Sequence, residues 1–357
     1  MDMAENKAKK WRTALTVVTF FGLILLVYVS REPIIETLKS LNDIKAWILL
    51  FMLFWQVINY HAYTQLYRSI FTILGKKIRY KTMYGIAVEL NFVNTVFPSV
   101  GVAGFSYFGY RMKQFGITAS KATLAHLMRF VSVFFAFQIL LIIGVIILSL
   151  DGKANNFTIL VAGSIGTALV IGSFFAIYIV GNKKRIDTFT SALTKFINKI
   201  IQAVRPKHPE TIKLAGVSRM FLELHEEYRS LSKSRTKLKT PLLYALLASA
   251  TEMTTLYTVF VAFGEPVNPG AVILAYAVAN FAGLVSVLPG GVGVYEALMT
   301  GVLAVAGVPP SIGLPATVMY RIISMTIQLP IGYYLYQRFL KNTGLSTDKL
   351  ESVRNNL

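Results

Sequence analysis

The chain of 357 residues contains no cysteine, and charged side chains make up only 15% of it. The absence of cysteine excludes disulfide bonds, thiolate metal sites, iron–sulfur ligation and a cysteine nucleophile. Apolar residues are abundant instead: 54% of the chain is hydrophobic, and long apolar runs recur along its whole length. A run of about 20 apolar residues crosses a bilayer as an α-helix. We therefore expect an all-α polytopic integral membrane protein.

The apolar runs predict six full spans and two interrupted stretches. The spans lie at about 13–30, 44–66, 122–149, 157–180, 241–263 and 314–337. The interrupted stretches, at 82–110 and 271–307, contain Pro and Gly where a full span would be continuous.

The net charge of +19 is distributed unevenly between the connections. Segments 1–13, 67–81, 111–121, 181–240 and 338–357 together hold 30 basic and 9 acidic residues, whereas the other connections hold four and five. Basic connections stay in the cytoplasm by the positive-inside rule. The charge pattern therefore predicts a multi-pass protein of the cell membrane with both termini in the cytoplasm. It argues against nucleic-acid binding, because no basic soluble domain remains.

This topology constrains the two interrupted stretches. The connections on both sides of 82–110 are basic, so that stretch should enter and leave on the cytoplasmic side. Its 29 residues are too few for two spans, which predicts a re-entrant helical hairpin with its tip near Pro98 and Ser99. Stretch 271–307 should form a second hairpin from the outer side, with its tip near Pro289, Gly290 and Gly291. Irregular backbone at membrane depth is tolerated where it lines a cavity, so the hairpins indicate a site.

The two halves of the chain resemble each other. Gly116 to Ser120 matches Gly307 to Ser311 at an offset of 191 residues, and Pro98 and Pro289 share that offset. The predicted orientations are opposite, which is the inverted-topology arrangement of secondary transporters. We expect a single membrane domain with a first repeat at about 44–149, a cytoplasmic insertion at about 181–240 and a second repeat at about 241–338. A gene duplication without any transport function is the open alternative.

Five charged residues lie inside the apolar stretches: Glu89, Arg129, Glu252, Glu296 and Arg321. An ionisable group within a membrane span usually faces a cavity or a partner of opposite charge. The two arginines should lie roughly 10 Å deep from opposite faces, at 1.5 Å per residue. Two interpretations stay open. Each arginine binds a phosphate or another anionic lipid group, or each pairs with a buried glutamate such as Glu89 or Glu296.

The hairpin tips offer a second attraction for an anion. A helix that begins at a tip points its free N–H groups into the membrane centre, and a helix N-terminus favours an anion. Gly290, Gly291 and Gly293 would let a headgroup approach the backbone, or they form a tight turn alone. The candidate residues for lipid binding and translocation are Arg129, Arg321, Glu296, Glu89, Pro98, Ser99, Pro289, Gly290, Gly291, Gly293, Glu252 and Tyr320.

The other polar residues and motifs do not indicate a metal site, a cofactor site or a catalytic site. His61 and His126 have no metal-like spacing to another ligand, so we expect no metal site. No P-loop, dinucleotide fingerprint, zinc-protease helix or nucleophile elbow occurs, so we expect no cofactor and no ATP hydrolysis. Segment 186–232 predicts two amphipathic helices, which form a hairpin on the membrane surface or a docking site for a cytoplasmic partner.

The second half carries a recognisable motif: Pro289-Gly290-Gly291-Val292-Gly293-Val294-Tyr295-Glu296, then Gly307-Val308-Pro309, then Tyr320-Arg321. It resembles the Pro-Gly-Gly-x-Gly-x-x-Glu … Gly-Val … Tyr-Arg pattern of lysylphosphatidylglycerol synthase transmembrane-region proteins. These flippase-like proteins correspond to the membrane half of the multiple peptide resistance factors. The resemblance runs from about 45 to 338. In the first half the family commonly shows Pro-Gly-Arg-x-Gly-Glu, whereas this chain has Pro98-Ser99-Val100-Gly101-Val102-Ala103.

The resemblance implies translocation of an anionic or aminoacylated phospholipid and a link to antimicrobial peptide resistance. Full-length members also carry a soluble domain that attaches lysine, and this chain ends 20 residues after its last predicted span. We therefore expect a transporter of phospholipid and no enzyme activity, although a family-derived name would mention a lysyltransferase. Two other functions stay open: a secondary transporter of a small anionic solute, and a membrane anchor for a separate synthase. Whether the protein is a homo-oligomer also stays open.

Overall fold

A computed structural model describes residues 44–97, 102–152, 235–283 and 293–342, with scattered positions at 28–35 and 163–192. Every regular element in these four ranges is helical. The predicted spans at 13–30 and 157–180, the amphipathic segment 186–232 and the hairpin tips at Pro98, Ser99, Pro289, Gly290 and Gly291 fall outside the four ranges.

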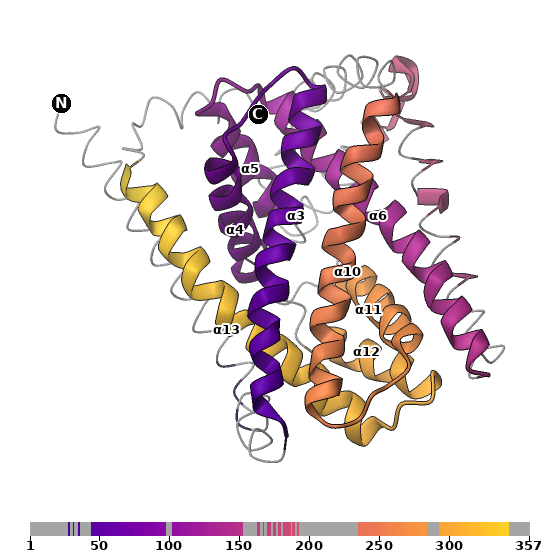
Figure 1. The fold of residues 1–357 in the computed structure, drawn as a ribbon. Helices are drawn as coiled ribbons and strands as arrows, with labels where there is room; N and C mark the ends of the chain where they lie inside the picture. The colour runs from indigo at the N-terminus through magenta and orange to yellow at the C-terminus, as the bar shows by residue number, and fades with distance from the viewer. Residues whose placement is uncertain are drawn as a thin grey trace, which may run out of the picture.

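Two long antiparallel helices form the middle of the bundle (Figure 1). The 3-10 helix η1 (Ala46–Leu50) leads into α3 (Phe51–Ile73), and η2 (Arg235–Leu238) leads into α10 (Lys239–Ala262). The Lys45 backbone N–H donates to the Ala262 carbonyl at 2.9 Å, so the start of α3 lies beside the end of α10. Both correspond to predicted spans, with α3 continuing seven residues past the expected end at 66.

Each interrupted stretch forms a pair of short helices. In the first half these are α4 (Tyr80–Val96) and α5 (Val102–Lys113), and in the second half α11 (Pro269–Gly283) and α12 (Val294–Val305). Helix α4 ends before Pro98 because the residue preceding a proline is disfavoured in the helical region, and Phe97 is extended (φ −93°, ψ 115°). The two pairs lie at opposite ends of the bundle (Figure 1), as the topology predicted.

A long helix follows each pair. Helix α6 (Ala119–Leu150) starts at the end where α5 finishes, and α13 (Pro310–Asn342) starts at the opposite end, where α12 finishes. Helices α6, α10 and α13 are the three described helices that are long and apolar enough to cross a membrane. They confirm an all-α membrane protein. The count of six spans and the inverted repeat stay predictions.

Four glycines end helices with the same turn. Gly75, Gly116, Gly264 and Gly307 have φ between 66° and 87°, a region that glycine enters without steric cost. At Gly116 and Gly307 the next residue's N–H reaches back to the helix, Ile117 to Met112 at 3.2 Å and Val308 to Leu303 at 2.9 Å. The turn therefore ends α5 in one predicted repeat and α12 in the other, at the two glycines that the sequence comparison aligned.

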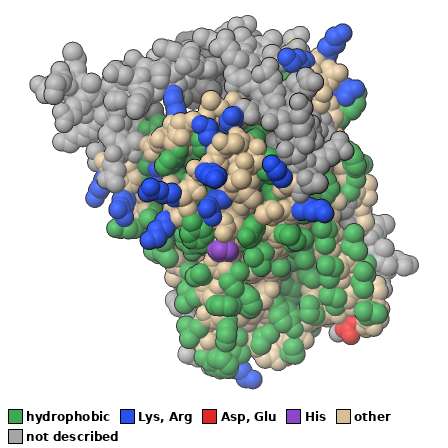
Figure 2. Space-filling view, turned by 45° about the horizontal axis from the view of Figure 1, so that its top comes forward, with side chains coloured by type: hydrophobic (Ala, Val, Ile, Leu, Met, Phe, Trp, Pro, Cys, Tyr) green, Lys and Arg blue, Asp and Glu red, His purple; other side chains and the backbone are tan. Residues whose placement is uncertain are grey.

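Lysines and arginines gather at one end of the bundle. Figure 2 shows many of them above a belt of apolar side chains. The opposite end carries Lys45, Asp151 and Glu265 at its helix ends, and the Asn268 side chain donates to Asp151 there at 2.9 Å. In the ranges described, the basic end is formed by Arg68, Lys76, Lys77, Arg79, Lys81, Lys113, Lys121, Lys237, Lys239, Arg338 and Lys341.

Candidate functional site

Glu252 lies in the middle of α10 and accepts hydrogen bonds from two neighbouring helices. The Tyr63 hydroxyl of α3 donates to Oε1 at 3.0 Å, and the Tyr276 hydroxyl of α11 donates to Oε2 at 2.5 Å. Asn59 Nδ2 of α3 lies 3.3 Å from Oε1 and also donates to the Ala248 carbonyl at 2.9 Å. The carboxylate thus joins α3, α10 and α11, and all of these donors are neutral.

Arg129 of α6 lies against aromatic rings. Its Cζ is 4.8 Å from the Tyr63 ring centroid and 5.1 Å from that of Phe130. Its buried Nε has no hydrogen-bond partner. Among the described residues no carboxylate forms an ion pair with Arg129. The Nε donor of this guanidinium is therefore available to an anion.

Arg321 of α13 has a different environment. Its Nη1 forms an ion pair with Oε1 of Glu296, and its Cζ lies 4.8 Å from the Tyr295 ring centroid. The other oxygen of Glu296 accepts the Gly293 backbone N–H at 2.7 Å, which caps the start of α12. Gly293 has a φ of 89°, a conformation that favours glycine. The pairing that the sequence left open is therefore confirmed for Arg321 and Glu296.

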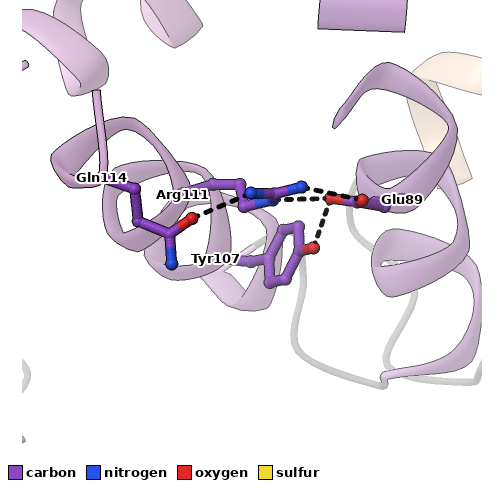
Figure 3. Close-up of polar contacts among 4 residues, drawn as sticks. All are labelled: Glu89, Tyr107, Arg111 and Gln114. Atoms are coloured by element: carbon purple, nitrogen blue, oxygen red, sulfur yellow. Dashed lines mark hydrogen bonds and ion pairs between the residues drawn. The ribbon is translucent and has the colours of Figure 1, made fainter. Parts of the chain in front are cut away.

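Glu89 binds an arginine that the sequence interpretation left in a connection. Arg111 of α5 donates to both Glu89 oxygens, from Nε at 2.8 Å and from Nη2 at 3.1 Å. The Tyr107 hydroxyl adds a hydrogen bond at 2.6 Å, and Gln114 accepts from Arg111 at 2.9 Å (Figure 3). Of the two open interpretations, pairing with Glu89 therefore does not apply to Arg129, because α5 returns beside α4 and brings Arg111 to the carboxylate.

The two arginines also lie farther along their helices than expected. Helix α6 begins at Ala119 and α13 at Pro310, three and four residues before the predicted starts. Arg129 and Arg321 are therefore roughly 15 Å from their helix starts at 1.5 Å per residue. A hydropathy boundary is a poor guide to a helix end. The depth of about 10 Å below the membrane surface stays a prediction.

A line of side chains connects the two halves, which we call the central polar chain: Arg129, Tyr63, Glu252, Tyr276 and Tyr320. Its last step is an edge-to-face contact between the Tyr276 and Tyr320 rings, whose centroids are 6.4 Å apart. Tyr320 precedes Arg321 in α13. Of the predicted site residues described here, the structure joins Arg129, Glu252 and Tyr320 in this chain. Glu89 lies in the separate cluster with Arg111, and Glu296 and Gly293 lie beside Arg321.

The two described histidines and Asn91 have structural partners. His126 bonds to the Tyr67 hydroxyl at 2.8 Å, and His61 to that of Tyr80 at 2.9 Å. Asn91 donates to the Tyr60 hydroxyl at 2.9 Å. Within the described ranges, no three His, Asp or Glu side chains are grouped as a metal site would require.

Sequence reasoning missed Tyr63, Tyr107, Arg111 and Tyr276. The chain contains 18 tyrosines, so no single one stands out. Tyrosines fit apolar spans by their rings, and only packing decides which hydroxyl reaches a carboxylate. Arg111 could have been found from the sequence. It directly follows the apolar stretch 82–110 and lies 22 residues after Glu89, so the second helix of the predicted hairpin could carry it back beside Glu89.

The comparisons with known proteins agree with the membrane architecture. Residues 13–332 match the family described as "Lysylphosphatidylglycerol synthase TM region". A UPF0104 membrane protein of Methanocaldococcus jannaschii is 22% identical over 333 residues, which cover 90% of this chain and 93% of that protein. A UPF0104 membrane protein of Methanothermobacter thermautotrophicus is 37% identical over 97 residues, covering 27% of this chain and 29% of that one.

Proposed function

Because the chain belongs to the lysylphosphatidylglycerol synthase transmembrane-region family, we propose that it moves a phospholipid with an anionic phosphate headgroup across the cell membrane, without nucleotide hydrolysis. The observation that carries the proposal is the position of Arg129 on α6 inside the bundle, without an ion-pair partner among the described residues. A charged group within a span is costly unless it serves a pathway or has a partner.

The chemistry of Arg129 suits a phosphate. A guanidinium donates two parallel N–H bonds to a phosphate or carboxylate and keeps its charge at any physiological pH. Arg321 has the same chemistry, but its Nη1 already forms an ion pair with Glu296. The proposal therefore assigns headgroup binding to Arg129 and a structural ion pair to Arg321. It requires no catalytic residue, since no covalent bond of the lipid changes.

Lipid movement by the purified protein tests the proposal. The protein is reconstituted in phosphatidylcholine vesicles with a trace of phosphatidylglycerol that carries a fluorophore on its acyl chain. Dithionite added outside bleaches only lipid in the outer leaflet. We expect the wild-type protein to bring inner-leaflet tracer to the outside. Arg129→Gln should slow this movement by about tenfold or more, since a hydrogen bond to a charged group contributes about 1.5–3 kcal/mol.

Arg79→Gln is the matched control, because Arg79 is exposed at the start of α4 and should leave the rate unchanged. Thermal melting of Arg129→Gln should fall less than that of Arg321→Gln, since it loses two ring contacts but breaks no ion pair of described residues. Wild-type vesicles that bleach no further than protein-free vesicles would contradict the proposal. Release of trapped inorganic phosphate without any lipid movement would favour a solute transporter instead.

We also propose that the basic end of the bundle faces the cytoplasm, as the positive-inside rule predicts. Because the chain contains no cysteine, each introduced thiol is unique. Gly152→Cys and Asn268→Cys, at the opposite end, should react with a membrane-impermeant maleimide added to intact cells. Lys76→Cys and Gln114→Cys should react only after the cells are opened. Labelling of position 114 in intact cells would show that the α4–α5 stretch crosses the membrane completely, contrary to the predicted hairpin.

A further inference from the structure

Glu252 is a carboxylate inside the membrane bundle that is held by neutral donors. Its described hydrogen bonds come from two tyrosine hydroxyls and one amide. Glu89 and Glu296 differ, because each contacts a guanidinium directly. A carboxylate with a cation in contact is fixed in its charged form, whereas neutral donors can hold either form after their hydroxyls turn. Glu252 is therefore the described membrane carboxylate best placed to change its charge.

Tyr63 connects this carboxylate to Arg129. Its hydroxyl donates to Glu252 at 3.0 Å, and its ring lies 4.8 Å from the Arg129 guanidinium carbon. Tyr63 therefore contacts both charges, the carboxylate through its hydroxyl and the guanidinium through its ring. The two opposite charges compensate each other without a direct ion pair.

Apart from Arg129 on α6, the titratable groups around Glu252 are tyrosines. They lie on four helices: Tyr60 and Tyr63 on α3, Tyr276 on α11, Tyr295 on α12 and Tyr320 on α13. Tyrosine is neutral near pH 7. Arg129 and Glu252 thus carry the charges of the central polar chain, and they sum to zero.

An anionic headgroup changes this balance. When a phosphate binds Arg129, it takes over the compensation of the guanidinium, and Glu252 becomes an uncompensated charge among tyrosines. A buried unpaired charge is strongly unfavourable, and the usual relief is protonation. The neutral acid still fits its site, because Tyr63 and Asn59 donate to Oε1 while a proton on Oε2 donates to the Tyr276 oxygen.

We propose that Glu252 binds one proton together with each anionic headgroup at Arg129, so that the protein moves the lipid and a proton in the same direction. The inference rests on the proposed lipid transport. It adds that the proton gradient across the membrane drives this transport. The proton comes from water on the side to which the site is open. It joins the carboxylate oxygen and returns to water on the other side when the headgroup leaves, so no net charge crosses the membrane.

A pH gradient across the vesicles described above tests the coupling. With one proton per lipid and a difference of one pH unit, the phosphatidylglycerol tracer should accumulate in the leaflet on the alkaline side. Its leaflet ratio should approach about tenfold, since one pH unit corresponds to a factor of ten in free proton. Glu252→Gln keeps the shape and a neutral site, so tracer should still move, but its leaflet ratio should stay near that of vesicles without a gradient.

Glu265→Gln is the matched control, because Glu265 is exposed just beyond the end of α10 and should show the wild-type ratio. The wild-type ratio decides the question even where Glu252→Gln does not assemble. Tracer that moves in wild-type vesicles but ignores the pH gradient would overturn the coupling and leave lipid transport standing. Accumulation that persists in a folded Glu252→Gln protein would overturn the role of Glu252. Absence of any tracer movement would overturn the proposed function itself.

Discussion

Replacing Arg321 with glutamine is expected to prevent most of the protein from assembling. Arg321 is 7% exposed, and its partner Glu296 caps the start of α12. Removal of the guanidinium leaves the Glu296 carboxylate, whose side chain is 14% exposed, without its cation. Loss of one partner of a buried ion pair costs about 3–5 kcal/mol. A loss of this size is comparable with the total stability of many proteins, about 5–15 kcal/mol. Yield of monodisperse protein in detergent and its melting temperature measure the effect.

The double variant Arg321→Gln with Glu296→Gln separates pairing from headgroup binding. It removes both charges together, so we expect recovery of most of the yield and of the melting temperature. Arg338→Gln, on the same helix but exposed, is the control and should behave as wild type. A single Arg321→Gln variant that assembles normally yet moves no lipid would show that Arg321 binds the headgroup and that its ion pair is dispensable.

The second large effect is expected at Arg111. Arg111→Gln leaves Glu89, which is 3% exposed, with the Tyr107 hydrogen bond alone. The expected cost is again about 3–5 kcal/mol, since a buried ion pair loses one partner. Arg111→Lys should recover only part of it, because an ammonium cannot donate to both carboxylate oxygens as the guanidinium does. The guanidinium also stacks on the Phe339 ring of α13, 4.2 Å from its centroid.

Tyr107→Phe is the graded comparison for this cluster. It removes one hydrogen bond and leaves the ion pair intact, so its cost should be about 1 kcal/mol. Glu89→Gln combined with Arg111→Gln should be more stable than Arg111→Gln alone. Melting of the four variants in one detergent provides the order. If Arg111→Gln melted within the range of Tyr107→Phe, the ion pair would have no structural role, and Glu89 would not need a cation.

Much of the architecture followed from the sequence because it depends on local chemistry. Long apolar runs predicted α6, α10 and α13, since a helix is the structure that satisfies every backbone group in lipid. The interrupted stretches predicted the short helix pairs, as a proline disfavours the helical region at the residue before it. The aligned segments that begin at Gly116 and Gly307 indicated equivalent places in the two halves, and both glycines adopt a positive φ. Each of these properties is read from neighbouring residues.

Only the tertiary structure decided which charges meet. The sequence identified Glu89, Arg129, Glu252, Glu296 and Arg321 as buried charges, but it could not assign partners, because partners come from helices far apart in the chain. Because α5 returns beside α4, Glu89 forms its ion pair with Arg111, and Arg129 contacts aromatic rings instead. The packing of α3 and α11 on α10 directs two of the many tyrosine hydroxyls to Glu252. The direction of a tyrosine hydroxyl depends on how the helix that carries it packs against its neighbours. The local sequence therefore cannot predict which hydroxyl reaches the carboxylate.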